Sequence, residues 1–185
     1  MRITVSGPPG SGTTSLAKYL ARRYGLTIIS AGEVFRQLAE ERGMDLAAFG
    51  ALAESDPSID RVIDERQKEI GERSDDIVVE GRLSGWMVEN ADLKIWLTAS
   101  AACRAKRVAG RDAVVEEAAV QQTEQREACE AARYRAYYGI DINAITPYHM
   151  VLNSEFWTAD ELGAIVDTAI SFLKRQPSSH PPGIC

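Results

Sequence analysis

The chain has 185 residues, of which 45% are hydrophobic and 26% charged, and its formal net charge is -6. This size fits one domain with a sizeable core, and the composition is ordinary for a globular protein. The acidic balance argues against a general nucleic-acid binder, which needs a surplus of Lys and Arg. Three scattered cysteines, Cys103, Cys129 and Cys185, match no metal spacing and predict reduced thiols in the cytoplasm. No apolar run is long enough to cross a membrane, so we do not expect a membrane as partner. The charge balance likewise leads us to expect no nucleic acid as partner.

Five short strands alternate with helical patterns along the chain. The expected strand ranges are 2–6, 27–30, 76–80, 93–97 and 149–153. Strand–helix alternation is typical of a parallel sheet covered by helices on both faces, so the fold class expected is α/β.

The interval between the second and third strands is too long for one crossover helix. It predicts helices over 31–42 and 46–54 and a third that begins at Pro57, after a cap at Asp56. The apolar face expected for this third helix carries Ile59, Val62, Ile63 and Ile70. An all-helical insertion between neighbouring strands is typical of a flap or subdomain.

A glycine-rich segment follows the first strand and precedes a helical pattern. Its sequence GPPGSGTT, residues 7–14, fits the phosphate-binding pattern G-x-x-x-x-G-K-[ST] at every fixed position except one. The glycines let the backbone turn amide N–H groups inward, and the helix N-terminus behind them also attracts phosphate. Thr14 takes the position whose hydroxyl binds Mg²⁺. We therefore expect a nucleotide phosphate at this loop rather than an ordinary strand–helix turn.

Thr13 stands where the pattern has lysine, which acts as a point charge near the β- and γ-phosphates. The amide cradle and Mg²⁺ remain without that lysine, and a cation from elsewhere in the chain can supply the missing charge.

Arginines recur at helical spacing in the two helices that follow the fourth strand. Arg104, Arg107 and Arg111 share one face of the first helix. The second helix is expected to begin at Thr123, and Arg126, Glu130 and Arg133 share one of its faces. Solvated faces with salt bridges are the alternative interpretation. Because phosphoryl transfer needs positive charge over the migrating group, we favour catalytic roles for Arg104, Arg107, Arg126 and Arg133.

The segments after the second and third strands suit a phosphate acceptor, because ligands bind at the carboxyl ends of strands in open α/β sheets. Arg36 and Arg82 can each fork onto a phosphate. Glu80 ends an apolar strand and is suited to holding water around Mg²⁺, with a helix-capping or solvent-facing glutamate as the alternative. Three polar residues share one face of the third insertion helix and could read a base edge, or could form a solvated face: Asp60, Asp64 and Gln67.

These motifs together resemble the nucleoside monophosphate kinases, and most closely the archaeal-type cytidylate kinases. The resemblance runs from Met1 to about Leu173, through SGPPGSGTT, SAGEVFRQLAEERGM, DPSIDRVIDERQ, EGRLSGWM, ADLKIWL and YYGIDI. Archaeal-type members commonly carry Thr at the lysine position, which implies that the loop is functional. In bacterial cytidylate kinases a G-R-D run stands at the place of EGRLSG, and the SAG spacing is closer to adenylate kinases.

The resemblance implies a P-loop kinase fold with strand order 2-3-1-4-5 and Mg²⁺-dependent transfer from ATP to CMP, and to dCMP. It implies that ATP is bound by Gly7, Pro8, Pro9, Gly10, Ser11, Gly12, Thr13, Thr14 and Ser15. The acceptor nucleotide is assigned to Ser30, Gly32, Arg36, Asp60, Asp64, Gln67, Gly81 and Arg82. Thr14 and Glu80 are assigned to the metal, the latter through water.

The expected layout is one domain over 1–175, with a core over 1–30, 76–99 and 137–175. Residues 31–75 would form the acceptor-binding insertion and 100–136 the lid, while 176–185 would be a disordered tail. We expect a cytoplasmic enzyme that is a monomer or small homo-oligomer. The alternatives are an adenylate kinase or other small-molecule kinase of this fold, and a non-catalytic ATP-binding regulator.

Overall fold

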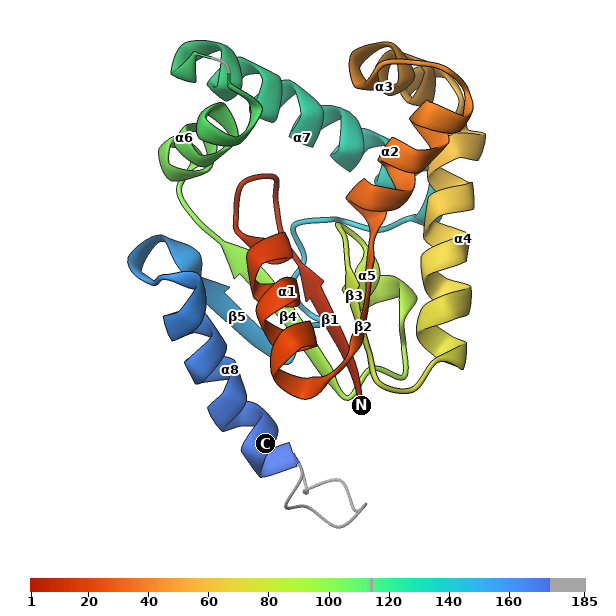
Figure 1. Ribbon diagram of the computed structural model, residues 1–185. Helices are drawn as coiled ribbons and strands as arrows, with labels where there is room; N and C mark the ends of the chain where they lie inside the picture. The colour runs from red at the N-terminus through yellow and green to blue at the C-terminus, as the bar shows by residue number, and fades with distance from the viewer. Residues whose placement is uncertain (114, 174–185) are drawn as a thin grey trace.

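A five-stranded parallel sheet forms the centre of the computed structural model, which describes residues 1–113 and 115–173 (Figure 1). The strand order is β2-β3-β1-β4-β5. The strands are β1 (Arg2–Ser6), β2 (Thr27–Ser30), β3 (Ile77–Glu80), β4 (Leu93–Thr98) and β5 (Met150–Asn153). The predicted α/β class and strand order are confirmed. The tail expected over 176–185, including Cys185, lies outside the described residues.

Helices fill the intervals between the strands. They are α1 (Thr13–Tyr24), α2 (Ala31–Glu41), α3 (Leu46–Ser55), α4 (Pro57–Arg73), α5 (Ser84–Met87), α6 (Ala101–Asp112), α7 (Glu116–Tyr138) and α8 (Ala159–Leu173), with a 3₁₀ turn η1 (Ser154–Phe156) before α8. None of the described helices is long and apolar enough to cross a membrane.

The main core lies between the sheet and the helices α1 and α8. Ile3 and Val5 of β1 and Leu16 and Leu20 of α1 are fully buried there, together with Val166 of α8. On the opposite face of the sheet, Trp96 of β4 packs with residues of α7 and of the segment that follows it. Burial on both faces explains why the strands are near-continuous apolar runs.

The three helices α2, α3 and α4 share a small core of their own, in which Phe49 and Ile59 are almost completely buried. The expectation for Val62 is wrong, since its side chain is 48% exposed. On α4, polar residues on the side away from Val62 are buried together with Ile59 and Ile63. Polar residues therefore occupy much of the face that α4 buries.

The carboxyl ends of the strands point toward one end of the molecule, where α2, α3, α6 and α7 gather (Figure 1). The loop between β1 and α1 reaches into the same region. The helix α7 starts at Glu116, earlier than the arginine pattern indicated, and spans from α6 toward α4. This end of the molecule brings together the segments to which the sequence assigns a site.

Candidate active site

The loop from Gly7 to Gly12 has the tight backbone that a phosphate cradle requires. Gly10 and Gly12 have φ values of 79° and 90°, a region that only glycine adopts without strain. Gly10 also approaches the α6 backbone so closely that an added Cβ would lie 2.5 Å from the carbonyl oxygen of Arg104. A side chain is therefore excluded at Gly10 by conformation and by space, and at Gly12 by conformation alone.

The helix α1 begins directly after this loop, and no side chain caps its N-terminus. Its first backbone N–H groups have no intrahelical partners, and the helix dipole adds positive potential at the same point. Thr14 is half-buried in this first turn, and none of the described residues hydrogen-bonds its hydroxyl. These groups can accept a phosphate and offer a hydroxyl oxygen to a cation.

Thr13 does not point into empty space where the lysine would be. Its hydroxyl donates a hydrogen bond of 2.6 Å to one carboxylate oxygen of Glu80, and the hydroxyl of Ser30 donates one of 2.5 Å to the other. Glu80 is only 8% exposed, so the alternative of a solvent-facing glutamate is wrong. The ends of β2 and β3 are thus connected to the phosphate loop.

Arg104 and Arg107 support the loop through its carbonyl groups. Arg104 donates to the carbonyl oxygens of Pro9 and Ala99 at 3.3 and 3.2 Å and pairs with Glu127 of α7. Arg107 donates to the Gly10 carbonyl at 3.3 Å and to Ser154. Both arginines lie against the loop, and their contacts there are with its backbone.

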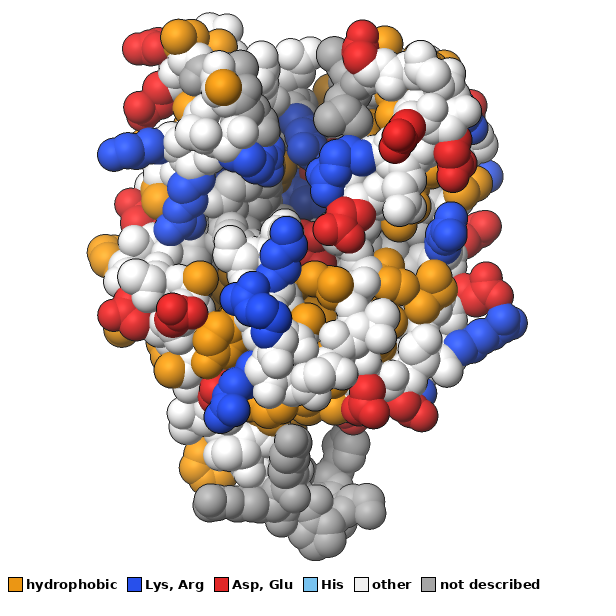
Figure 2. Space-filling view, viewed as in Figure 1, with side chains coloured by type: hydrophobic (Ala, Val, Ile, Leu, Met, Phe, Trp, Pro, Cys, Tyr) orange, Lys and Arg blue, Asp and Glu red, His pale blue; other side chains and the backbone are white. Residues whose placement is uncertain are grey.

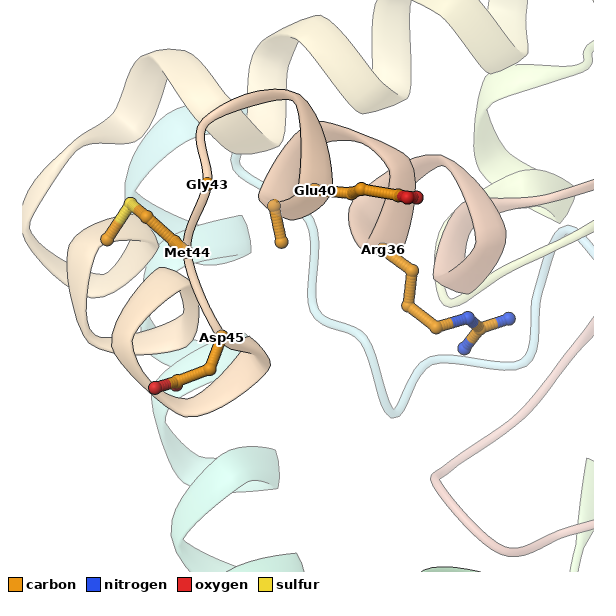
Figure 3. Close-up of a pocket in the computed structure, with 6 residues that line it drawn as sticks. Arg36, Glu40, Gly43, Met44 and Asp45 are labelled. Atoms are coloured by element: carbon orange, nitrogen blue, oxygen red, sulfur yellow. The ribbon is translucent and has the colours of Figure 1, made fainter.

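The acceptor side begins with Arg36, which is exposed and pairs with none of the described residues. Its guanidinium lies close to Gly32, where an added Cβ would be 3.4 Å from Nη1. Arg36 borders an open depression over the turn between α2 and α3, and its side chain points away from Met44 and Asp45 (Figure 3). It is free to meet an anion on that side.

Gln67 and Gly81 meet at the end of β3. The Gln67 amide donates a 2.8 Å hydrogen bond to the Glu80 carbonyl, while its oxygen is buried with no partner. A Cβ at Gly81 would lie 2.9 Å from that oxygen. The glycine therefore makes room for the Gln67 side chain, whose unpaired acceptor is available to a donor.

Asp60 and Asp64 are buried on α4 and bonded to α7, so the solvated-face alternative is wrong for both. Arg133 donates to Asp60 at 2.6 Å, and the Tyr138 hydroxyl donates to Asp64 at 2.9 Å. Burial raises the pKa of Asp60, although Arg133 opposes the shift. Burial raises the pKa of Asp64 to about 7. A carboxyl group whose pKa is near 7 is partly protonated at neutral pH, so it can either donate or accept a hydrogen bond.

One carboxylate holds two of the expected site arginines. Glu130 of α7 accepts from Arg82 at 2.5 Å and from Arg126 at 2.7 Å. Burial would raise the pKa of Glu130, but the two guanidinium groups outweigh it, and the pKa is lowered. Arg82 from the acceptor side and Arg126 from α7 are thereby held as a unit.

A cavity of about 390 Å³ joins the two sides of the site. Pro8 of the loop, Arg82 of the acceptor side and Arg104 of α6 all line it, with Glu127 of α7. At this end of the molecule, Figure 2 shows a hollow between the lobe of α6 and α7 and the lobe of α2 and α3, in which Lys and Arg side chains gather. The site is therefore suited to a ligand with several negative charges.

Comparison with known proteins agrees with this geometry. The model of the Cytidylate kinase-like family matches residues 2–155. The chain belongs to this family. Its relatives include the cytidylate kinase of Methanoculleus marisnigri, 64% identical over 97% of this chain and 99% of that protein. Another is the cytidylate kinase of Methanoregula boonei, 63% identical over 96% of this chain and 98% of that protein.

Solved structures of more distant proteins share the fold of this cytidylate kinase-like chain. Shikimate kinase from Bacteroides thetaiotaomicron superposes with a TM-score of 0.62 at 14% identity, covering 92% of this chain and 98% of that one. Shikimate kinase from Acinetobacter baumannii gives a TM-score of 0.58 at 15% identity, covering 94% of each chain. At these identities the likeness supports the P-loop kinase fold alone.

Two residues of the site have no counterpart in the sequence predictions. Glu127 and Tyr138, both on α7, bind Arg104 and Asp64. Nothing in the local pattern distinguishes them from other glutamates and tyrosines of the same helix. The signal that could have found them is their place on the helix face that also carries Glu130.

Proposed function

We propose that this chain is a cytoplasmic cytidylate kinase, which transfers the γ-phosphoryl group of ATP to CMP or dCMP and releases ADP and CDP or dCDP. The observation that carries the proposal is the cavity that the phosphate loop shares with Arg82 and Arg104. There the phosphates of the donor and acceptor nucleotides would meet, between the loop and the two guanidinium groups. The family match and the names of the relatives support the same activity.

The donor side would be the loop and the first turn of α1. Its amide groups would cradle the ATP phosphates, while Arg104 and Arg107 would hold the loop in shape through the carbonyls they contact. The hard oxygen atoms of Thr14 and Glu80 fit Mg²⁺, which is usually bound by one or two carboxylates and substrate phosphates. When bound, Mg²⁺ would neutralise charge on the transferring phosphates.

The acceptor side would be formed by the ends of β2 and β3 together with α4. Arg36 and Arg82 would bind the phosphate of CMP, and the buried face of α4 with Asp64 and Gln67 would receive the base. Arg126 and Arg133 remain candidates for closing over the transferring group. In the structure, both are paired with carboxylates.

The reaction needs no side-chain nucleophile. An oxygen of the acceptor phosphate attacks the γ-phosphorus in line, and the bond from that phosphorus to the leaving oxygen of ADP breaks. The protein contributes positioning, positive charge and exclusion of water, since water would otherwise accept the phosphoryl group.

A nucleotide panel tests the proposal. Purified protein is assayed with ATP and Mg²⁺ against CMP, dCMP, UMP and AMP, and CMP or dCMP is expected to be the best acceptor. A preference for AMP would identify an adenylate kinase instead. Binding of ATP without formation of any diphosphate would identify a regulator.

A pair of glycine variants excludes a contaminating kinase. Gly10→Ala adds a methyl group that must displace the Arg104 carbonyl, and it should abolish turnover. Gly25→Ala also strains a positive φ, 67°, but meets nothing within 4 Å and lies at the far end of α1. It should retain turnover. Equal activity of the two variants would mean that the activity comes from another protein.

A further inference from the structure

The missing lysine of the loop is replaced by a particular contact, not by a gap. Thr13 is at the lysine position, and its hydroxyl donates to Glu80 at 2.6 Å. Ser30 donates to the other oxygen of the same carboxylate. A carboxylate can accept about four hydrogen bonds, so Glu80 keeps lone pairs for a further partner.

Glu80 is buried, but no cation pairs with it among the residues that the structure describes. It is 8% exposed, and none of the Lys or Arg side chains in the described ranges pairs with it. A buried carboxylate is costly unless it is paired with a cation or bound to a metal. The described part of the chain also has no cluster of three His, Cys, Asp or Glu side chains that could hold a metal ion by itself. A cation at Glu80 would therefore need further oxygen ligands, which the Thr14 hydroxyl and the phosphates of ATP would supply.

We propose that Thr13 is a positioning residue for Glu80. Its hydroxyl and that of Ser30 fix the carboxylate beside the loop, where it holds the divalent cation that accompanies ATP. That cation then supplies the charge that lysine supplies in loops that match the full pattern. This inference rests on the donor site of the proposed function. A lysine at position 13 would instead have Glu80 within reach and would form an ion pair with it. The threonine thus belongs together with the buried glutamate, which no Lys or Arg of the described residues pairs with.

The dependence of ATP affinity on Mg²⁺ tests this role without any need for turnover. ATP binding is measured by titration calorimetry in Mg²⁺ and in EDTA, and Mn²⁺ binding to the ATP complex by electron paramagnetic resonance. Thr13→Val keeps the shape but removes the hydroxyl. We expect it to reduce the gain in ATP affinity on adding Mg²⁺ by about tenfold, as for loss of a hydrogen bond to a charged group, with little change in EDTA.

Matched variants separate positioning from general damage. Thr13→Ser keeps the donor and should restore the Mg²⁺ effect. Thr4→Val makes the same substitution at a fully buried β1 residue whose hydroxyl has no hydrogen-bond partner, and it should bind like the wild type. Because Thr13 acts through Glu80, adding Thr13→Val to Glu80→Gln should change the Mg²⁺ effect no further.

Two results would overturn the inference. In one, Thr13→Val and the wild type gain equally from Mg²⁺. In the other, Thr13→Val loses affinity equally in Mg²⁺ and in EDTA, which would mean that the hydroxyl acts on the phosphates directly. Either result, with a wild type that forms CDP, leaves the proposed function intact. A wild type that binds no ATP in either buffer would instead refute that function.

Discussion

The two arginines of the proposed acceptor site differ in their contacts with the rest of the protein. Arg36 is exposed and has no partner among the described residues. The Arg82 side chain is only 12% exposed and is bonded to Glu130, which is itself buried. Removing Arg82 therefore strips a partner from a buried carboxylate, whereas removing Arg36 leaves no protein group unsatisfied.

We expect Arg36→Ala and Arg82→Ala both to raise the KM for CMP, because each removes a charge-assisted contact worth about 1.5–3 kcal/mol, roughly tenfold or more. Only Arg82→Ala should also lower the melting temperature. Breaking a buried ion pair costs about 3–5 kcal/mol, reduced here because Arg126 remains on Glu130. Steady-state kinetics with CMP and with ATP, together with thermal melting, check both effects. An equal rise in the KM for ATP would move these arginines out of the acceptor site.

At the scale of secondary-structure elements, α7 connects parts of the site that lie far apart in the sequence. Its carboxylates Glu127 and Glu130 hold Arg104 of α6 and Arg82 after β3. Its C-terminal half reaches α4 through Tyr138 and Asp64.

The contact between α4 and α7 should depend on pH, because the pKa of Asp64 is raised to about 7 by burial.

The direction of this dependence follows from linkage. An aspartate in an unfolded chain has a pKa of about 3.9, so as pH rises the unfolded chain releases this proton first. Asp64 therefore makes the folded protein less stable as pH rises from about 4 to about 7, by up to about 1.4 kcal/mol per pH unit. Above that range its effect is constant.

Asp64→Asn removes the charge and can still accept the hydrogen bond from Tyr138. We expect the variant to gain stability relative to the wild type as pH increases from 5 to about 7, as measured by thermal melting at several pH values. Asp160→Asn, at an exposed position in the first turn of α8, serves as the control for a general loss of carboxylate. A difference between Asp64→Asn and wild type that stays constant across this range would contradict the assigned shift.

At the scale of the whole molecule, the charge balance and the site oppose one another. The net charge of -6 repels an anionic nucleotide, yet Lys and Arg side chains gather in the hollow between the two lobes (Figure 2). Attraction by these groups is partly screened by salt, because the Debye length falls from about 10 Å at 0.1 M to about 3 Å at 1 M. Binding should therefore weaken as ionic strength increases.

We expect the KM for CMP to rise severalfold between about 0.05 M and about 0.5 M KCl, with a smaller change in kcat. Initial rates at saturating ATP and fixed free Mg²⁺ check this, and sucrose at equal osmolality controls for solvent effects. A KM that does not respond to salt would mean that the arginines stay neutralised by Glu127 and Glu130 when the acceptor binds.

The sequence was most informative where local patterns decide the structure. Glycine spacing around Gly10 predicted the loop, and apolar runs predicted the five strands within a residue of their observed ends. The burial of Asp60 and Asp64 could not be predicted, because their partners on α7 lie 73 and 74 positions away. The early start of α7 was also missed, since its first two turns carry few large apolar side chains.

The positions of the three tryptophans make their intrinsic fluorescence a useful probe of the site. Trp96 lines the cavity beside Arg82 and Glu127, and Trp86 packs against the same apolar cluster beneath α7. Trp157 is 46% exposed, after η1 and outside that cluster. With Trp157→Phe, the remaining indole emission would come from beneath the helix that bridges both halves of the site. Nucleotide binding could then be followed by intrinsic fluorescence in stopped flow, with no attached dye.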